Sequence, residues 1–201
     1  MTDTDKFKGI KTAQIKIDLR KKYGLPKNAF IISHTGHLNE NRNLRSLIPL
    51  QKAGCQIVIV GSSSTPKDSI GPNSLKEELL NEVIIILDGY IEHIEEIYQL
   101  SDAYIFPVVA QNSSIGMPLS ILEARACGIP VLTTNFGSIQ KFMGDDDGGI
   151  FYSAPEKFLK VLTKITTKKD LSFTKTKISK LNEKYFKIIF NAIEDRNVIN
   201  E

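Results

Sequence analysis

The sequence has little of what secreted, membrane-spanning or metal-binding proteins use. It has only two cysteines, Cys55 and Cys127, both in apolar surroundings and neither at metal-ligand spacing from a histidine or another cysteine. We therefore expect reduced, packed thiols in a reducing compartment. His34 and His93 belong to no constellation and are expected to be structural or solvated. No apolar run approaches the roughly 18 residues of a membrane span, and the N-terminus lacks a signal-peptide pattern, so we expect a cytoplasmic protein.

The sequence also has no large excess of charge of one sign. The 26 basic and 23 acidic side chains leave a formal net charge of +3, which is too balanced to argue for nucleic acid or an acidic membrane without a local cluster. The lysines from Lys157 onwards alternate with apolar residues and indicate a solvated helix face. With 201 residues, 41% of them hydrophobic, the chain can bury a core. We expect one domain, residues 1–201, with its core over about residues 25–165.

Segments rich in isoleucine and valine recur at regular intervals. Most are near-continuous apolar runs, which favours a sheet covered on both faces and therefore parallel strands joined by helical crossovers. Apolar residues at helical spacing lie between these segments, so strands and helices alternate. The pattern predicts an α/β fold with an open, doubly wound parallel sheet of about six strands. The expected strands are residues 29–33, 56–60, 83–87, 103–106, 131–134 and 149–152.

Both ends of the chain lie outside this alternation. Residues 12–23 are expected to form a short helix closed by Gly24 and Pro26, because glycine adopts the left-handed cap and proline cannot continue a helix. An apolar stripe predicts a long amphipathic helix over about residues 172–196, which needs a surface to lie on. Residues 61–72 have the composition of a long loop.

The loop after the first expected strand is a candidate site, because ligands of open parallel sheets bind at the carboxyl ends of strands. Gly36 would let the backbone approach a ligand closely. Arg42 is expected at the start of the next helix, where a cation is unfavourable unless an anion is shared. A solvated arginine in a capping loop explains the same residues equally well.

The loop after the fourth expected strand is the second candidate. Residues 107–118 are mostly small or polar and lead into a helix that begins near Leu119. The free N–H groups of that helix would point back at the strand ends and favour an anion site. Glu123 lies beside the buried stripe of this helix, so its carboxylate needs protein donors or ligand hydroxyls. A helix-dipole role is the alternative for Glu123.

These segments, in this order, resemble one enzyme family. Residues 116–131, Gly-Met-Pro-Leu-Ser-Ile-Leu-Glu-Ala-Arg-Ala-Cys-Gly-Ile-Pro-Val, closely resemble the donor-site segment of GT-B glycosyltransferases of the family 4, or group 1, type. Gly-His-Leu at residues 36–38, with Arg42, is similar to the first loop of these enzymes. Residues 134–137, Thr-Asn-Phe-Gly, resemble a later turn of the same family. The resemblance extends over about residues 25–165.

The resemblance implies a Rossmann-like domain that holds a nucleotide-diphosphate sugar, with the acceptor held by a separate or missing N-terminal domain. Arg42 would neutralise the diphosphate and Glu123 would accept hydrogen bonds from the ribose, which makes them the candidate catalytic residues. A diphosphate leaving group needs fixed positive potential, and with no metal ligands visible in the sequence we expect no metal and no further cofactor. The other implied donor-site residues are Gly36, His37, Tyr90, Ile91, Ser114, Ile115, Gly116, Met117, Leu119, Ser120 and Ile121.

The sequence departs from the family pattern at two positions. Retaining members usually carry paired glutamates, and here Ile115 replaces the first while Glu123 keeps the second. The sugar contact of the missing glutamate is then either moved to residues 112–114 or lost. His37 stands where arginine is usual, and histidine is charged only when protonated. We therefore expect diphosphate binding that is weaker than usual and sensitive to pH.

The favoured interpretation is the donor-binding half of a sugar transferase, inactive alone because both halves must enclose the reacting bond. The alternative is a non-catalytic partner subunit whose site has decayed at Ile115 and His37. A flavodoxin-like regulatory domain is disfavoured because no acidic cluster ends the first expected strand. The expected partners are a nucleotide sugar and an acceptor-binding domain or subunit. No nucleic acid is expected, and membrane association would be peripheral, through that partner.

Overall fold

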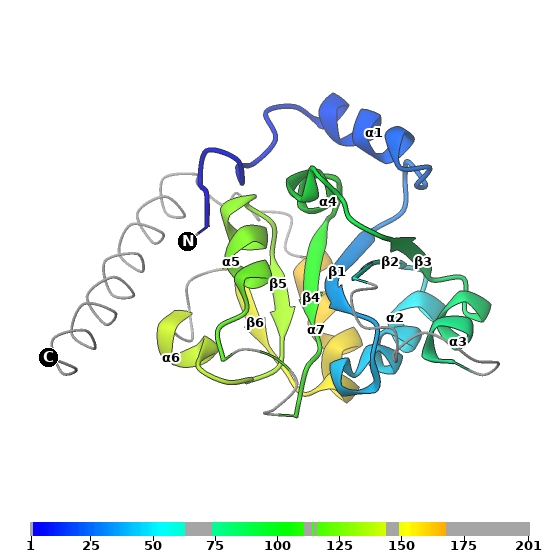
Figure 1. Ribbon diagram of the computed structural model, residues 1–201, viewed down its shortest axis with the longest axis vertical. Coiled ribbons are helices and arrows are strands. Elements are labelled where there is room, and N and C mark those ends of the chain that lie inside the picture. Colours follow the sequence, from blue (N-terminus) through cyan, green and yellow to red (C-terminus); the bar gives the residue numbers. More distant parts are fainter. Residues whose placement is uncertain (1, 63–73, 111–113, 115, 144–148, 168–201) are drawn as a thin grey trace, which may run out of the picture.

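The computed structural model describes residues 2–62, 74–110, 114, 116–143 and 149–167 (Figure 1). Its strands form one parallel six-stranded sheet in the order β3-β2-β1-β4-β5-β6. This architecture confirms the predicted doubly wound, Rossmann-like α/β fold. The strands are β1 (Ile31–His37), β2 (Gln56–Ser62), β3 (Ile85–Asp88), β4 (Ala103–Phe106), β5 (Val131–Thr133) and β6 (Ile150–Tyr152).

Helices cover both faces of this sheet. One face of the central strands packs on α2, α3 and α7 through residues such as Ile59, Leu50 and Leu162. The opposite face packs on α4, α5 and α6 through residues such as Tyr104 and Ile121. In Figure 1, α4 and α5 lie in front of the sheet and α7 behind it. The helices are α1 (Ala13–Lys22), α2 (Ile48–Lys52), α3 (Leu75–Asn81), α4 (Ile94–Leu100), α5 (Leu119–Ala126), α6 (Ile139–Met143) and α7 (Phe158–Thr167).

The first strand is longer than its sequence pattern predicts. The pattern predicts a loop from residue 35 onwards, whereas β1 continues to His37. The reason is that β1 stays paired with β2 through Gly36↔Gly61 and His37↔Ser62. Gly61, predicted to begin a loop, is likewise part of β2. Polar residues and a glycine are therefore retained in the strand by their neighbour.

The segment after β1 also differs from its prediction. Instead of one helix, two 3₁₀ turns, η1 (Glu40–Arg42) and η2 (Leu44–Leu47), precede the short α2. They meet at Asn43, which has the left-handed conformation with φ 56°. Arg42 is therefore the last residue of a 3₁₀ turn, and the prediction that it begins the crossover helix is wrong.

The helix predicted at residues 12–23 is confirmed as α1. Thr12 caps it by accepting a hydrogen bond from the backbone N–H of Ile15, and Gly24 follows with φ 66°. Arg20 ties α1 to the sheet through an ion pair of 2.7 Å with Asp102, at the entrance of β4.

Some predictions fall outside the described residues. These include the amphipathic helix over about residues 172–196 and most of the loop over residues 61–72. Among the helices that the structure describes, none has the length and apolar character needed to cross a bilayer.

Candidate functional site

The strand order has its switch point between β1 and β4, where open α/β sheets are expected to form a ligand-binding crevice. These central neighbours pair only at Ile32↔Ala103 and Ser33↔Tyr104, although β1 stays paired with β2 to its last residue. The chain winds away from this point in both directions, from β1 to β3 and from β4 to β6. Such a switch point, at the carboxyl ends of the strands, is where ligands bind in open α/β sheets.

Gly36 and Arg42 meet on the β1 side of the crevice. A Cβ atom at Gly36 would lie 3.9 Å from Cζ of Arg42 and 3.2 Å from Nε2 of His34. The guanidinium of Arg42 makes no ion pair with any described residue, and its Nε is buried without a hydrogen-bond partner in the described part of the chain. Burial lowers the pKa of Arg42, but an arginine remains charged.

The turn that carries Arg42 is fixed to β4. The side-chain amide of Asn43 donates to the carbonyl oxygen of Pro107, just after β4, at 3.1 Å. The backbone N–H of Arg42 donates to the carbonyl oxygen of Asn39 at 3.1 Å. His37 completes this side: its Nδ1 is buried and also lacks a hydrogen-bond partner among the described residues. The first loop therefore presents polar groups that the described part of the chain leaves unpaired.

Glu123 lies on the β4 side, one turn into α5. Its Oε2 accepts a 2.7 Å hydrogen bond from the Tyr98 hydroxyl of α4. The Thr35 hydroxyl lies 3.2 Å from that of Tyr98 and 3.3 Å from that of Tyr104. A chain of hydroxyl groups thus runs from the strand ends to the carboxylate. Burial raises the pKa of Glu123, while the Tyr98 hydrogen bond and the charge of Lys6 act in the opposite direction.

The charge of Glu123 acts on the buried Tyr104. The Tyr104 ring is fully buried on β4, and the charge of Glu123 contributes to raising its pKa, after the larger effect of burial. The geometric link between the two candidate catalytic residues runs through β1: Gly36 faces Arg42, and its neighbour Thr35 hydrogen-bonds with Tyr98, which donates to Glu123.

The N-cap residue of α5 is Pro118, whose side chain makes no capping hydrogen bond to the first turn of the helix. Leu119 is 46% exposed, whereas the side chain of Ile121 is buried in the core, so only backbone of Ile121 could contact a ligand. Ser120 is half-buried and contributes a side-chain hydrogen bond to Tyr104.

The loop before α5 rests on the loop after β5. The backbone N–H of Ser138 donates to the carbonyl oxygen of Gly116 at 2.8 Å. Gly137, with φ 56°, touches Gly116 so closely that an added Cβ would lie 2.4 Å from that oxygen. Ser114 and Met117 are half-buried. Ile115 lies outside the described residues.

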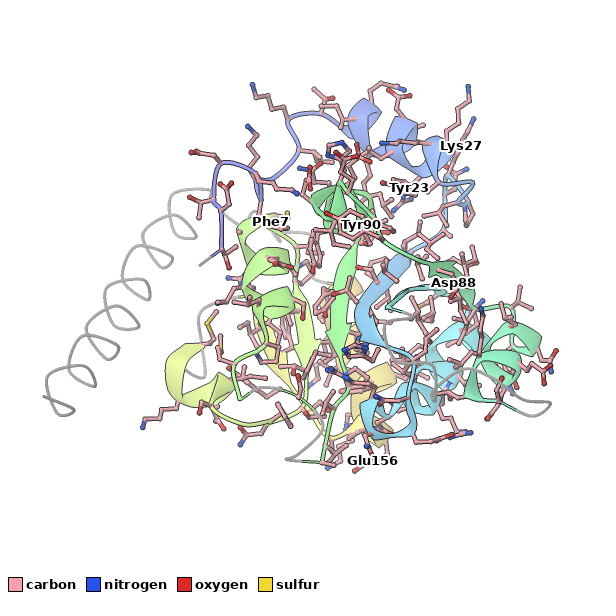
Figure 2. All side chains as sticks on the ribbon, in the orientation of Figure 1. Phe7, Tyr23, Lys27, Asp88, Tyr90 and Glu156 are labelled. Atoms are coloured by element: carbon pink, nitrogen blue, oxygen red, sulfur yellow. The ribbon has the colours of Figure 1, made fainter. Side chains whose placement is uncertain are left out.

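Tyr90 and Ile91 follow β3, farther along the same edge of the sheet. Tyr90 is 92% exposed and projects near α4 (Figure 2). Ile91 packs partly against the core residues of β1, β2 and α4. No described contact links either residue to Arg42 or Glu123, so their role stays a prediction.

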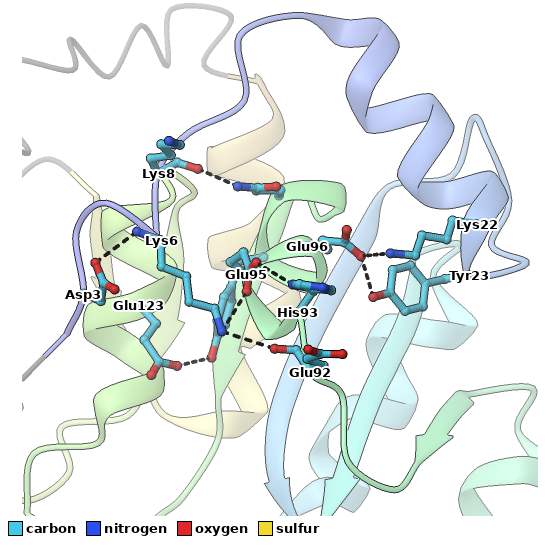
Figure 3. A network of polar contacts seen from close by, with 12 residues as sticks. Asp3, Lys6, Lys8, Lys22, Tyr23, Glu92, His93, Glu95, Glu96 and Glu123 are labelled. Atoms are coloured by element: carbon cyan, nitrogen blue, oxygen red, sulfur yellow. Dashed lines mark hydrogen bonds and ion pairs between the residues drawn. The ribbon is translucent and has the colours of Figure 1, made fainter.

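An N-terminal segment lies across α4 and α5, close to Glu123 (Figure 3). Phe7 is buried, with its ring centroid 6.0 Å from that of Tyr98. The Nζ atom of Lys6 lies 3.4 Å from a carboxylate oxygen of Glu95 and 3.2 Å from the carbonyl oxygen of Glu92. Within the described residues, no cluster of three or more histidine, cysteine, aspartate or glutamate side chains could hold a metal ion.

Comparison with known proteins identifies the family. Residues 30–168 match the sequence model of the family described as "Glycosyl transferases group 1". The chain belongs to the group 1 glycosyltransferases. A curated relative, the UDP-Gal:alpha-D-GlcNAc-diphosphoundecaprenol alpha-1,3-galactosyltransferase of Escherichia coli, is 26% identical in an alignment of 172 positions that covers 78% of this chain and 42% of the relative.

Solved structures show the same fold for this group 1 glycosyltransferase chain. Anabaena Alr3699/HepE, in complex with UDP and glucose, matches with a TM-score of 0.74 and 17% identity, over 100% of this chain and 55% of that one. The C-terminal domain of the group 1 family protein LpcC from Francisella tularensis matches with a TM-score of 0.69 and 18% identity, over 92% of this chain and 98% of that domain. The chain thus spans about half the length of the longer relatives and has the fold of the C-terminal domain.

Sequence reasoning missed three residues that border the candidate site. Tyr98 and Tyr104 occupy positions typical of core residues. The only signal in the sequence is that a buried tyrosine hydroxyl needs a polar partner. His34 is fully buried at the point where β1 and β4 separate, and a lone histidine in an apolar strand gives no hint of that separation.

Proposed function

We propose that this chain binds a nucleoside-diphosphate sugar and presents it to an acceptor held by another domain or subunit. The observation that carries the proposal is the connection of Arg42 and Glu123 through the end of β1: Gly36 faces Arg42, and its neighbour Thr35 hydrogen-bonds with Tyr98, which donates to Glu123. A cation and a carboxylate so placed offer one group for a diphosphate and one for hydroxyl groups.

The diphosphate would lie against Gly36, Arg42 and the start of α5. Arg42 has no competing ion pair among the described residues, so its N–H groups are available for phosphate oxygens. The missing side chain at Gly36 lets a ligand approach the strand backbone. The first turn of α5 supplies further N–H groups and the positive end of the helix dipole.

The ribose would bind at Glu123. One carboxylate oxygen already accepts from Tyr98, and a carboxylate has about four lone-pair directions. Because the surroundings of Glu123 are partly desolvated, its pKa is raised, and added hydroxyl donors would stabilise the ionised form. Two neighbouring ribose hydroxyls are donors of this kind.

The comparisons support UDP as the first nucleotide to examine. The name of the Escherichia coli relative specifies UDP-Gal, and the Anabaena structure contains UDP. Because transfer needs both halves of such an enzyme around the reacting bond, we expect the chain to bind UDP but not to transfer a sugar alone.

Isothermal titration calorimetry with UDP tests the proposal. A hydrogen bond to a charged group contributes about 1.5–3 kcal/mol, so we expect Arg42→Ala to weaken binding roughly tenfold to a hundredfold and Glu123→Gln to weaken it as well. Arg45→Ala is the matched control, because Arg45 is already held in ion pairs by Glu40 and Glu78. Its affinity for UDP should be unchanged.

Two outcomes would contradict the proposal. If neither UDP nor GDP nor ADP binds the unsubstituted chain, the alternative of a non-catalytic partner subunit is favoured. If UDP binds equally well after Arg42→Ala and Glu123→Gln, the site lies elsewhere.

A further inference from the structure

His34 occupies the point where the two central strands separate. The pairing of β1 with β4 ends at Ser33↔Tyr104, so His34 is the first residue of β1 beyond it. Its ring is completely buried, and its Nδ1 lies 3.0 Å from the carbonyl oxygen of Ile105 on β4. The imidazole thus joins the two strands at the base of the crevice.

The contact with Ile105 fixes the tautomer of His34. A carbonyl oxygen can only accept a hydrogen bond, so Nδ1 carries the proton and Nε2 presents a lone pair. Burial, with a smaller effect from the charge of Arg42, lowers the pKa of His34 to about 4, which makes the ring neutral at pH 7. Nε2 is therefore a buried acceptor, and it has no partner among the residues that the structure describes.

An unused donor of Arg42 faces the same space as Nε2 of His34. The position of a Cβ at Gly36 is 3.2 Å from Nε2 of His34 and 3.9 Å from Cζ of Arg42, so both side chains face the same small space. Nε of Arg42 is also buried and unpaired within the described residues. A buried polar atom without a partner is unfavourable, and one water molecule can bridge a donor and an acceptor in such a space.

We propose that His34 is a positioning residue for Arg42: one water molecule donates to its Nε2 and accepts from the guanidinium, and this bridge directs the remaining N–H groups towards the diphosphate. The inference rests on the proposed function, which supplies the diphosphate as the target of Arg42. A neutral acceptor suits this role, because a carboxylate in its place would hold the guanidinium but would also offset the charge that attracts the diphosphate.

Two substitutions separate positioning from a structural role. In His34→Asn, the amide nitrogen can still donate to Ile105, but no acceptor reaches the position of Nε2. In His34→Gln, the longer side chain can place its carbonyl oxygen there. Cooperative thermal unfolding of both variants first shows that they are folded.

The affinity of the full chain for UDP is the first readout. We expect His34→Asn to weaken UDP binding about tenfold, equivalent to about 1.4 kcal/mol, and His34→Gln to restore the affinity to within about threefold of the unsubstituted chain. The proposal is overturned if folded His34→Asn binds UDP as tightly as the unsubstituted chain. It is also overturned if the Gln variant loses as much affinity as the Asn variant.

Imidazole ¹⁵N NMR provides a readout that needs no ligand. We expect the Nδ1–H tautomer and an Nε2 resonance that moves on Arg42→Ala but not on the control Arg45→Ala. An Nε2 resonance that Arg42→Ala leaves unchanged, with and without UDP, removes the contact and the inference with it. If the chain binds no nucleotide, the proposed function fails, and the NMR result still decides whether His34 and Arg42 interact.

Discussion

The buried side chain of Arg20 connects α1 to the sheet, and its contribution to stability can be tested by one substitution. Its side chain is 6% exposed and donates four hydrogen bonds. Three go to backbone carbonyl oxygens, of Leu100 at 3.0 Å, Lys27 at 2.7 Å and Ala29 at 3.1 Å. The fourth goes to a carboxylate oxygen of Asp102 at 2.7 Å. One guanidinium therefore joins α1, the segment that follows it and the entrance of β4.

Arg20→Met keeps a long apolar stem and removes all four bonds. Asp102 is not left alone, because it still contacts Nζ of Lys16 at 2.5 Å and the backbone N–H of Ile31 at 2.7 Å. The main cost is three carbonyl groups without a donor, at about 1 kcal/mol each where water cannot reach them. We expect the free energy of unfolding to fall by about 3 kcal/mol, the lower end for a broken buried ion pair.

Urea unfolding followed by circular dichroism measures this loss. Lys22→Met is the matched control on the same helix, because it removes an ion pair with Glu96 whose lysine is 52% exposed. Such surface pairs contribute at most about 1 kcal/mol. A loss for Arg20→Met no larger than that of the control would refute the view that Arg20 fastens α1 to the sheet.

Two further predictions concern the crevice. The pKa of His34 is about 4 in the folded chain and about 6.5 when the chain is unfolded. Between these two values the unfolded chain binds a proton that the folded chain does not. The free energy of unfolding therefore falls by up to about 3 kcal/mol as the pH drops from 6.5 to 4, and His34 has no such effect above pH 6.5. Urea unfolding should show that His34→Gln lacks this component, and parallel pH curves for the two proteins would contradict it. Tyr98→Phe removes the donor to Glu123 and should lower the free energy of unfolding by about 2 kcal/mol, whereas Tyr90→Phe, at a side chain that is 92% exposed, should not. Equal urea midpoints for these two variants would show that the Tyr98 hydroxyl contributes nothing to stability.

The buried strands could be predicted because their apolar runs are local. The range predicted for β4 agrees with the structure, and those for β5 and β6 differ by one residue at one end. The end of β1 could not be found in this way, since Thr35, Gly36 and His37 read as a loop. They form a strand because β2 supplies hydrogen-bonding partners from a distant part of the sequence.

The candidate site also has a part that the sequence predicts and a part that it does not. Motif spacing singled out Arg42 and Glu123, and the structure connects them through Gly36, which faces Arg42, and its neighbour Thr35, which hydrogen-bonds with Tyr98, the donor to Glu123. Their surroundings depend on contacts between segments, which spacing does not contain. Asn43 offered the one local signal for the turn at Arg42, because asparagine tolerates the left-handed conformation that interrupts the expected helix.

The parting of β1 and β4 explains why polar residues gather in the middle of this sheet. Where two strands separate, groups that would otherwise be paired across the sheet need other partners. His34 donates to the carbonyl oxygen of Ile105, and Thr35 hydrogen-bonds with Tyr98 and Tyr104. The same side chains then border the space in which a ligand would lie. Replacing His34 with an apolar residue of similar size would fill the gap but leave the carbonyl oxygen of Ile105 without this donor. Stability and ligand binding are therefore expected to fall together in such a variant. The two effects should separate only in variants that replace the function of one ring nitrogen and not of the other.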